Sequence, residues 1–153
     1  MNGQDPVPAV LFDIDGTLVD SNYLHVHAWI RAFAALKIPV EAWRIHRCIG
    51  MDGTTLMRTL AGDVEQEVLD SLKDRHSEFY QESTSLLTPL PGARDLLHRV
   101  AEQGLQVVLA TSAPEDELST LREVLDCDDV VAAFTSSEDV DTCLLYTSDA
   151  ADE

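Results

Sequence analysis

Hydrophobic and polar positions along the chain follow two kinds of pattern, short apolar runs and longer amphipathic repeats. The apolar runs Ala9–Phe12, Leu105–Thr111 and Val130–Phe134 are bounded by polar or turn-forming residues. Runs of this kind are typical of strands buried on both faces of a parallel sheet. Helical patterns separate the second strand from its neighbours. The alternation of strands and helices predicts an α/β fold with a parallel sheet.

Two helices are expected between the later strands. The first has Pro91 near its start and Gly104 just past its end, positions that these residues favour in helices. Its inward-facing side chains are expected to be Leu96, Leu97 and Val100. The second helix begins at Pro114, and its apolar positions are Leu118, Leu121 and Leu125.

Residues 21–83 interrupt this alternation with helical patterns and no strand signal. The first helix starts at Ser21, with Asp20 or Ser21 as its cap. The segment His46–Gly53 contains two glycines and is expected to be a loop. One face of the first helix is expected to present Leu24, Ala28, Ala32 and Leu36.

Two further helices are expected in the same insertion. Thr54–Leu60 is a short helix closed by Gly62, and Asp63 opens a longer helix with Gln66 as its capping-box partner. Apolar positions along the longer helix, with His76 on the same side, are Val64, Val68, Leu72 and Phe79. Trp29 and Trp43 are interpreted as packing residues rather than as a surface that stacks on substrate.

These patterns predict three parts. Residues 7–20 and 84–142 form an incomplete α/β core, a partial Rossmann-like parallel sheet. Residues 21–83 form an inserted all-helical cap. Residues 143–153 are expected to be a non-native tail.

Composition excludes several classes of function. The chain of 153 residues has 28 acidic and 10 basic residues, a net charge of −18. Such an excess of acid opposes binding to nucleic acid or to an anionic membrane surface. Apolar runs are too short to span a bilayer, and the first residues carry no signal-peptide pattern, so a cytoplasmic location is expected. The three cysteines lack metal-site spacing and are interpreted as reduced structural thiols.

Candidate chemistry gathers where two predicted strands end. Asp13 and Asp15 follow the first strand, and Thr111 and Ser112 follow the second. Ligands of open α/β sheets bind at the carboxyl ends of the strands, so these side chains are expected to meet there. Two neighbouring carboxylates repel each other, which favours a divalent cation such as Mg²⁺ together with a phosphate ligand. Gly16 permits the turn that aims both carboxylates at one point.

The motif "DIDGT" after a buried strand, a helical insertion and then "VVLATS" resembles the haloacid dehalogenase superfamily, in particular its phosphatase and β-phosphoglucomutase-like members with a helical cap. The resemblance implies that Asp13 is a nucleophile and Asp15 a general acid and base. It also implies that the Asp13 side chain and the Asp15 backbone carbonyl bind Mg²⁺. Thr111, with Ser112 and Gly16, would bind the phosphoryl group.

The aspartate pair has two other interpretations. A solvated turn after a strand would give the same local sequence. A calcium-binding loop counted from Asp13 requires glycine and glutamate where this chain has Leu18 and Leu24, so that alternative fails.

The resemblance also predicts a lysine soon after "TSSEDVD" and a later acidic pair that completes the metal site. The chain instead continues as "CLLYTSDAADE". We therefore expect residues 143–153 to be a read-through of an adapter-like sequence after a truncated gene, with a divergent natural terminus as the alternative. As written, the chain is expected to be inactive and poorly stable.

Residues of the expected cap bear on the substrate. His25 stands where the resemblance places a histidine, although a local structural role is an equal alternative. Met51, Asp52 and Gly53 are expected to form a loop that approaches the substrate. This loop has no arginine before Arg58 to hold a second phosphate, which favours hydrolysis of one monoester.

The sequence thus predicts a Mg²⁺-dependent phosphatase of small phosphorylated metabolites. The alternatives are a sugar phosphomutase of the β-phosphoglucomutase type and a non-catalytic fragment that binds phosphate or metal. The oligomeric state is not predicted.

Overall fold

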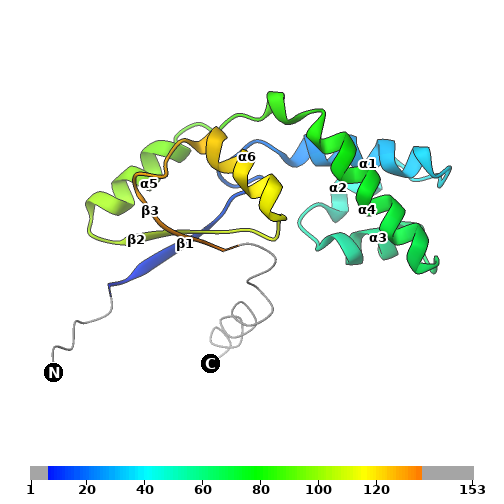
Figure 1. Ribbon diagram of the computed structural model, residues 1–153, viewed down its shortest axis with the longest axis horizontal. Helices are drawn as coiled ribbons and strands as arrows, with labels where there is room; N and C mark the ends of the chain where they lie inside the picture. The colour runs from blue at the N-terminus through cyan, green and yellow to red at the C-terminus, as the bar shows by residue number, and fades with distance from the viewer. Residues whose placement is uncertain (1–6, 136–153) are drawn as a thin grey trace, which may run out of the picture. The chain divides into compact units, whose positions relative to one another are not determined.

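The computed structural model describes residues 7–135 and confirms the predicted α/β fold (Figure 1). Its sheet has three parallel strands, β1 (Ala9–Asp13), β2 (Gln106–Ala110) and β3 (Val131–Thr135), in that spatial order. All three strands match the predicted apolar runs to within one residue at each end. The strand order places β2 in the centre, so the ends of β1 and β3 flank the end of β2.

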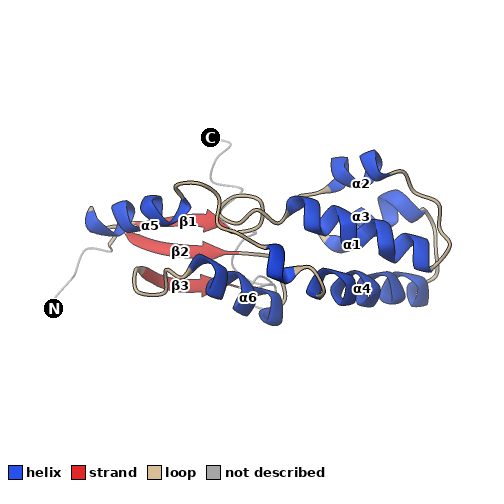
Figure 2. Cartoon of the chain, turned by 90° about the horizontal axis from the view of Figure 1, so that it is seen from above, coloured by secondary structure: helices blue, strands red, loops and turns tan. Residues whose placement is uncertain are grey.

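Two helices cover one face of this sheet, α5 (Ala93–Glu102) and α6 (Glu115–Leu125) (Figure 2). The two helices lie on the same side because the connections from β1 to β2 and from β2 to β3 are right-handed crossovers that advance in the same direction across the sheet. Alternate residues of β2 and the inward positions of both helices are buried in this layer, namely Val107, Leu109, Leu97, Leu121 and Leu125.

Two burial predictions in this part of the chain were wrong. Ala9–Phe12 is not a fully buried strand: β1 lies at the edge of the sheet, and Leu11 is 55% exposed. Leu11 pairs with Val108, and both point away from the buried Val107 and Leu109, because side chains alternate between the two faces of a strand. In α5, Leu97 is fully buried but Leu96 is 45% exposed, because one helix face touches the sheet and adjacent residues point 100° apart.

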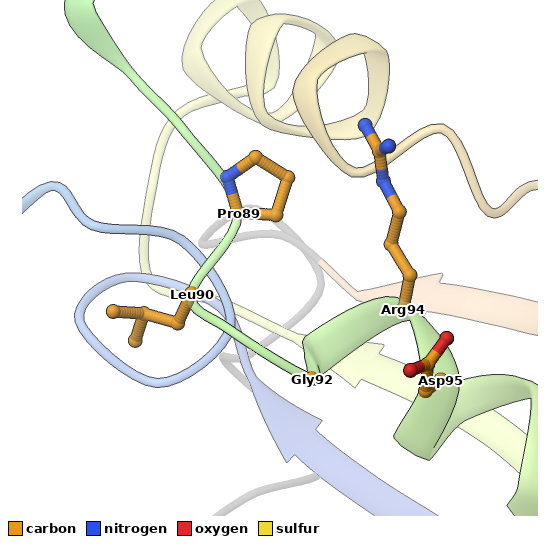
Figure 3. Close-up of a pocket in the computed structure, with 5 residues that line it drawn as sticks. All are labelled: Pro89, Leu90, Gly92, Arg94 and Asp95. Atoms are coloured by element: carbon orange, nitrogen blue, oxygen red, sulfur yellow. The ribbon is translucent and has the colours of Figure 1, made fainter.

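Arg94 ties α5 to the end of α6. Its Nε donates to the carbonyl oxygen of Leu125 at 2.7 Å, and an Nη donates to that of Val124 at 2.8 Å. The last carbonyls of a helix lack partners within the helix, and a cation at this end also matches the helix dipole. Figure 3 shows the Arg94 side chain extending from α5 toward that helix.

Replacing Arg94 with alanine is expected to lower the free energy of unfolding by about 1–2 kcal/mol, because two charge-assisted hydrogen bonds to carbonyls are lost at a partly exposed site. Urea unfolding followed by circular dichroism measures the change. Arg99→Ala is the matched control, since Arg99 is an exposed arginine of the same helix. Equal stabilities of the two variants would contradict this role for Arg94.

Residue contacts divide the chain into two compact units, residues 1–20 with 88–153 and residues 21–87. The second, called the helical unit here, contains α1 (Asn22–Ala35), α2 (Ala42–Cys48), α3 (Gly53–Ala61), α4 (Gln66–Gln81) and the 3₁₀ turn Thr84–Leu86. Its core joins all four α-helices, and its most deeply buried members are Ala32, Phe33, Ile45, Leu56, Leu69 and Leu72. Whether this unit acts as a cap stays a prediction.

Helices α1 and α4 form the main contact of the helical unit. Arg31 of α1 links them twice, through an ion pair with Glu82 just after α4 and through its guanidinium, which lies 3.9 Å from the centre of the Phe79 ring. The Arg31 guanidinium therefore contacts both an aromatic face and a carboxylate.

Several local predictions in the helical unit need correction. Part of the expected loop His46–Gly53 is helical, because α2 continues to Cys48 and α3 begins at Gly53. The expected capping box at Asp63 is absent: α4 begins at Gln66 after Glu65, which makes no side-chain cap. Trp29 is buried as predicted, but Trp43 is 59% exposed and does not pack.

Candidate active site

Asp13 is the last residue of β1, and its Cα lies beside that of Ala110, the last residue of β2. Its side chain is exposed at the carboxyl edge of the sheet. Thr17 Oγ1 donates to Asp13 Oδ2 at 3.0 Å and fixes that oxygen. The other carboxylate oxygen is therefore the one that a ligand at this edge would meet.

A tight turn follows Asp13 and carries Asp15. The backbone N–H groups of Thr17, Leu18 and Val19 all donate to the carbonyl oxygen of Ile14 at 2.9–3.2 Å. Ile14, Leu18 and Val19 are almost fully buried, so the turn is anchored by apolar side chains. Gly16 has a φ of +68°, a left-handed conformation that favours glycine.

Thr111 stands directly after β2 and is 4% exposed. Its Oγ1 accepts a hydrogen bond from the N–H of Ala113 at 3.0 Å and makes a long donor contact of 3.5 Å to Asp15 Oδ2. Its own N–H donates to the carbonyl oxygen of Thr135 at the end of β3. The structure thus brings Asp13, Asp15 and Thr111 to one edge of the sheet, with Ser112 exposed beside them.

The electrostatics of this edge are acidic. The first turn of α6, which follows Ser112, contains Glu115, Asp116 and Glu117. These carboxylates stabilise the positive end of the helix dipole and leave it less able to attract a phosphate. Two arginines of residues 88–135 have their partners at the far end of α6. Arg94 donates to the last carbonyls of that helix, and Arg122 pairs with Asp128 just after it.

A metal ion fits the donor chemistry of the aspartate pair only in part. The Asp13 carboxylate and the Asp15 backbone carbonyl are hard oxygen ligands of the kind that Mg²⁺ prefers. Residues 7–135 contain no group of three or more histidine, cysteine, aspartate or glutamate side chains able to hold an ion. The positions after residue 141, where the resemblance predicts a lysine and an acidic pair, lie outside the described residues.

His25 belongs to the helical unit and is half-buried on α1. Its ring is stacked on Tyr80 of α4, with centroids 4.1 Å apart and planes within 5°. Its Nδ1 lies 3.2 Å from Nε2 of His76, also on α4. His25 is therefore held by a polar and aromatic cluster of its own unit.

The other predicted residues of the helical unit lie between α2 and α3. Met51 is 45% exposed, and Gly53 begins α3. Asp52 is the N-cap of α3, and its Oδ1 accepts a hydrogen bond from the N–H of Thr55 at 3.0 Å. Hydrogen bonds from the Thr55 side chain and then from its backbone hold the pKa of Asp52 below its usual value. Capping accounts for this aspartate without a substrate.

A shallow hollow of about 320 Å³ lies elsewhere, lined by Pro89, Leu90, Gly92, Arg94 and Asp95 (Figure 3). None of the predicted site residues lines it. Its cation, Arg94, is engaged by the carbonyls of α6, and Asp95 is acidic, so the hollow offers no clear anion site.

Sequence reasoning missed two contributors. Thr17 was not singled out, although a threonine four residues after Asp13 within a glycine turn is placed to reach back to that carboxylate. His76 was expected on the inner side of its helix, but its contact with His25 spans 51 residues and leaves no local signal.

Comparison with known proteins agrees with the fold. A model of the haloacid dehalogenase-like hydrolase family matches residues 10–143. A phosphoglycolate phosphatase of Pseudomonas fluorescens is 31% identical over 113 residues, 69% of this chain and 42% of the relative. A phosphorylated carbohydrates phosphatase of Thermotoga maritima is 31% identical over 119 residues, 76% of this chain and 55% of the relative.

Among solved structures, a hydrolase from Pseudomonas syringae superposes with a TM-score of 0.79 at 33% identity, covering 87% of this chain and 62% of that one. Together these findings define a protein with a parallel α/β fold and a set of helices inserted after its first strand. The chain belongs to the haloacid dehalogenase-like hydrolase family. It spans about half the length of the curated relatives it matches.

No helix in the described part of the chain is both long and apolar enough to cross a membrane.

Proposed function

We propose that these residues belong to a Mg²⁺-dependent phosphatase that hydrolyses small phosphate monoesters through an aspartyl-phosphate. The observation that carries the proposal is the placement of Asp13 at the end of β1, beside the end of β2 and the buried Thr111. Family membership and the phosphatase names of the two curated relatives support it.

The Asp13 carboxylate oxygen that Thr17 does not hold attacks phosphorus in line with the ester oxygen. The phosphorus–oxygen bond to the leaving group breaks, and protonated Asp15 donates its proton to that oxygen. Asp15 then takes a proton from a water molecule that attacks the aspartyl-phosphate, which releases inorganic phosphate and restores Asp13. Thr111 and Ser112 donate hydrogen bonds to the phosphoryl oxygens.

The Asp13 carboxylate and the Asp15 backbone carbonyl would hold the metal ion. When bound, Mg²⁺ supplies positive charge that offsets the carboxylate and phosphate charges. The acidity around α6 makes such compensation necessary, because the described residues at this edge provide no cation of their own.

We propose a small phosphorylated metabolite as the substrate, in line with the names of the relatives. A mutase must hold a second phosphate, and the connection Ile49–Asp52 provides no basic side chain for it. Asp52 in addition carries negative charge at the N-terminus of α3. These features favour hydrolysis over transfer between sugar positions.

The test uses two proteins: the chain itself, and a chimera in which residues 143–153 are replaced by the C-terminal part of the Pseudomonas syringae hydrolase. We expect the chimera to release inorganic phosphate from p-nitrophenyl phosphate and phosphoglycolate in Mg²⁺. EDTA should abolish this activity, and added Mg²⁺ should restore it. Glucose 1-phosphate distinguishes the mutase, which would yield glucose 6-phosphate. A folded chimera that hydrolyses no monoester in Mg²⁺ would remove the proposal.

A further inference from the structure

Four aromatic rings from α1 and α4 form a continuous cluster inside the helical unit. Trp29 stacks on His76, with centroids 4.1 Å apart and planes at 21°, and Tyr80 stacks on His25 at 4.1 Å and 5°. Between the two stacks, the histidine rings have centroids 5.3 Å apart and planes within 13°. Each imidazole therefore has an aromatic ring on one face, which restrains its rotation.

The two imidazoles meet edge to edge through a pair of nitrogens. Nδ1 of His25 lies 3.2 Å from Nε2 of His76, a hydrogen-bond distance that requires a proton on one nitrogen and a lone pair on the other. With both rings doubly protonated, two N–H groups would face each other and two positive charges would adjoin. The contact therefore excludes that state and selects complementary tautomers when both rings are neutral.

Burial favours the neutral form of the His76 ring. Burial, and then the nearby charge of His25, lower the pKa of His76 from 6.5 to about 3. His76 is therefore held neutral, and its Nε2 can offer a lone pair to the Nδ1–H of His25. His76 must then carry its own proton on Nδ1.

Other charges of the packed helices act elsewhere. Arg31 pairs with Glu82, and Arg75 pairs with Glu78 on the surface of α4. On α2, His46 contacts Tyr23 rather than the pair. The remaining ionisable side chains on α1 and α4 are exposed: His27, Glu67, Asp70, Lys73 and Asp74. Within the described residues, the charge that lowers the pKa of His76 is that of His25.

We propose that His76 is a positioning residue for His25: its Nε2 fixes the orientation and the tautomer of the His25 imidazole. The consequence for catalysis rests on the proposed phosphatase function, because it applies only if His25 meets substrate. The pairing itself is a property of the helical unit and is tested without activity.

The experiment is ¹⁵N-detected NMR of the histidine rings in the full 153-residue chain, with EDTA present so that no trace metal bridges the two nitrogens. At pH 8 we expect one tautomer to dominate each ring, with a proton on only one of the two facing nitrogens. At pH 5 we expect His76 to remain neutral with its proton on Nδ1. Mixed tautomers in both rings, or a His76 ring protonated on both nitrogens at pH 5, would overturn the proposal.

Three variants separate positioning from simple packing. His76→Phe keeps a ring against Trp29 but removes the acceptor, so His25 should lose its single tautomer. His76→Gln places an amide oxygen near the original Nε2 and should restore it. His27→Phe, on the exposed face of α1, is the matched control and should leave the His25 signals unchanged. A single His25 tautomer in His76→Phe would show that His76 only packs and would overturn the proposal.

Discussion

Replacing Asp13 with asparagine is expected to reduce phosphate release by the chimera by at least about 10⁴-fold. An amide is a poor nucleophile toward phosphorus, and it also removes the charged ligand from the proposed metal site. No neighbouring carboxylate can take over the role of Asp13. Thr17 holds Asp13 at the end of β1, whereas Asp15 belongs to the turn that follows the strand. Steady-state kinetics in saturating Mg²⁺ measures the change.

Asp15→Asn provides the mechanistic contrast. This change keeps the backbone carbonyl that would bind the metal but removes the group that gives and takes the proton, so a loss of about 10²–10⁴-fold is expected with metal binding retained. Asp20→Asn is the matched control, since Asp20 is an exposed aspartate that follows the same turn. If Asp13→Asn kept a rate within tenfold of the parent chimera, Asp13 could not be the nucleophile.

The sheet was predictable from the sequence because its signals are local and mutually consistent. Each strand is a short apolar run, and the helix between β2 and β3 begins after Pro114 and repeats leucine at helical spacing. Topology rules then predict that β1 and β2 are neighbours, which they are. The proximity of Asp13 to Thr111 follows from that pairing, although their catalytic roles remain predictions.

Errors arose where local patterns are ambiguous. Helix α2 has only Ile45 and Cys48 buried on its inner side, too short a repeat to outweigh the glycines that follow. Leu96 and Leu97 are both apolar, and only tertiary packing decides that Leu97 faces the sheet. Burial of β1 depends on which elements lie beyond its edge, and a strand's own sequence does not specify them.

The histidine pair could not be predicted in this way. His25 and His76 lie 51 positions apart on different helices, and their contact depends on how α1 and α4 pack. Each histidine alone resembles an ordinary polar residue on a helix. Only the three-dimensional structure shows that His76 loses solvent and faces another imidazole.

Acid is expected to destabilise the helical unit through His76. In the unfolded chain this imidazole takes up a proton as the pH falls below about 6.5, but in the folded chain it stays neutral until about pH 3. Unfolding therefore binds a proton in this interval. The stabilising contribution of neutral His76 is fully present above pH 6.5, falls by up to about 1.4 kcal/mol for each pH unit below it, and levels off below pH 3.

Urea unfolding between pH 7.5 and 4.5 measures this slope. In a Trp43→Phe background, fluorescence reports only Trp29, the ring that stacks on His76, and the exposed position of Trp43 makes that substitution mild. The same titration with His76→Phe removes the titrating group but keeps an aromatic ring in the stack. Carboxylates that titrate near pH 4–5 are common to both proteins, so the difference between the two slopes reports the histidine pair. We expect the parent to lose stability more steeply than His76→Phe as the pH falls from 6.5. Parallel curves over this range would mean that His76 accepts a proton in the folded state as readily as in the unfolded one, and that the ring is not held neutral by its surroundings.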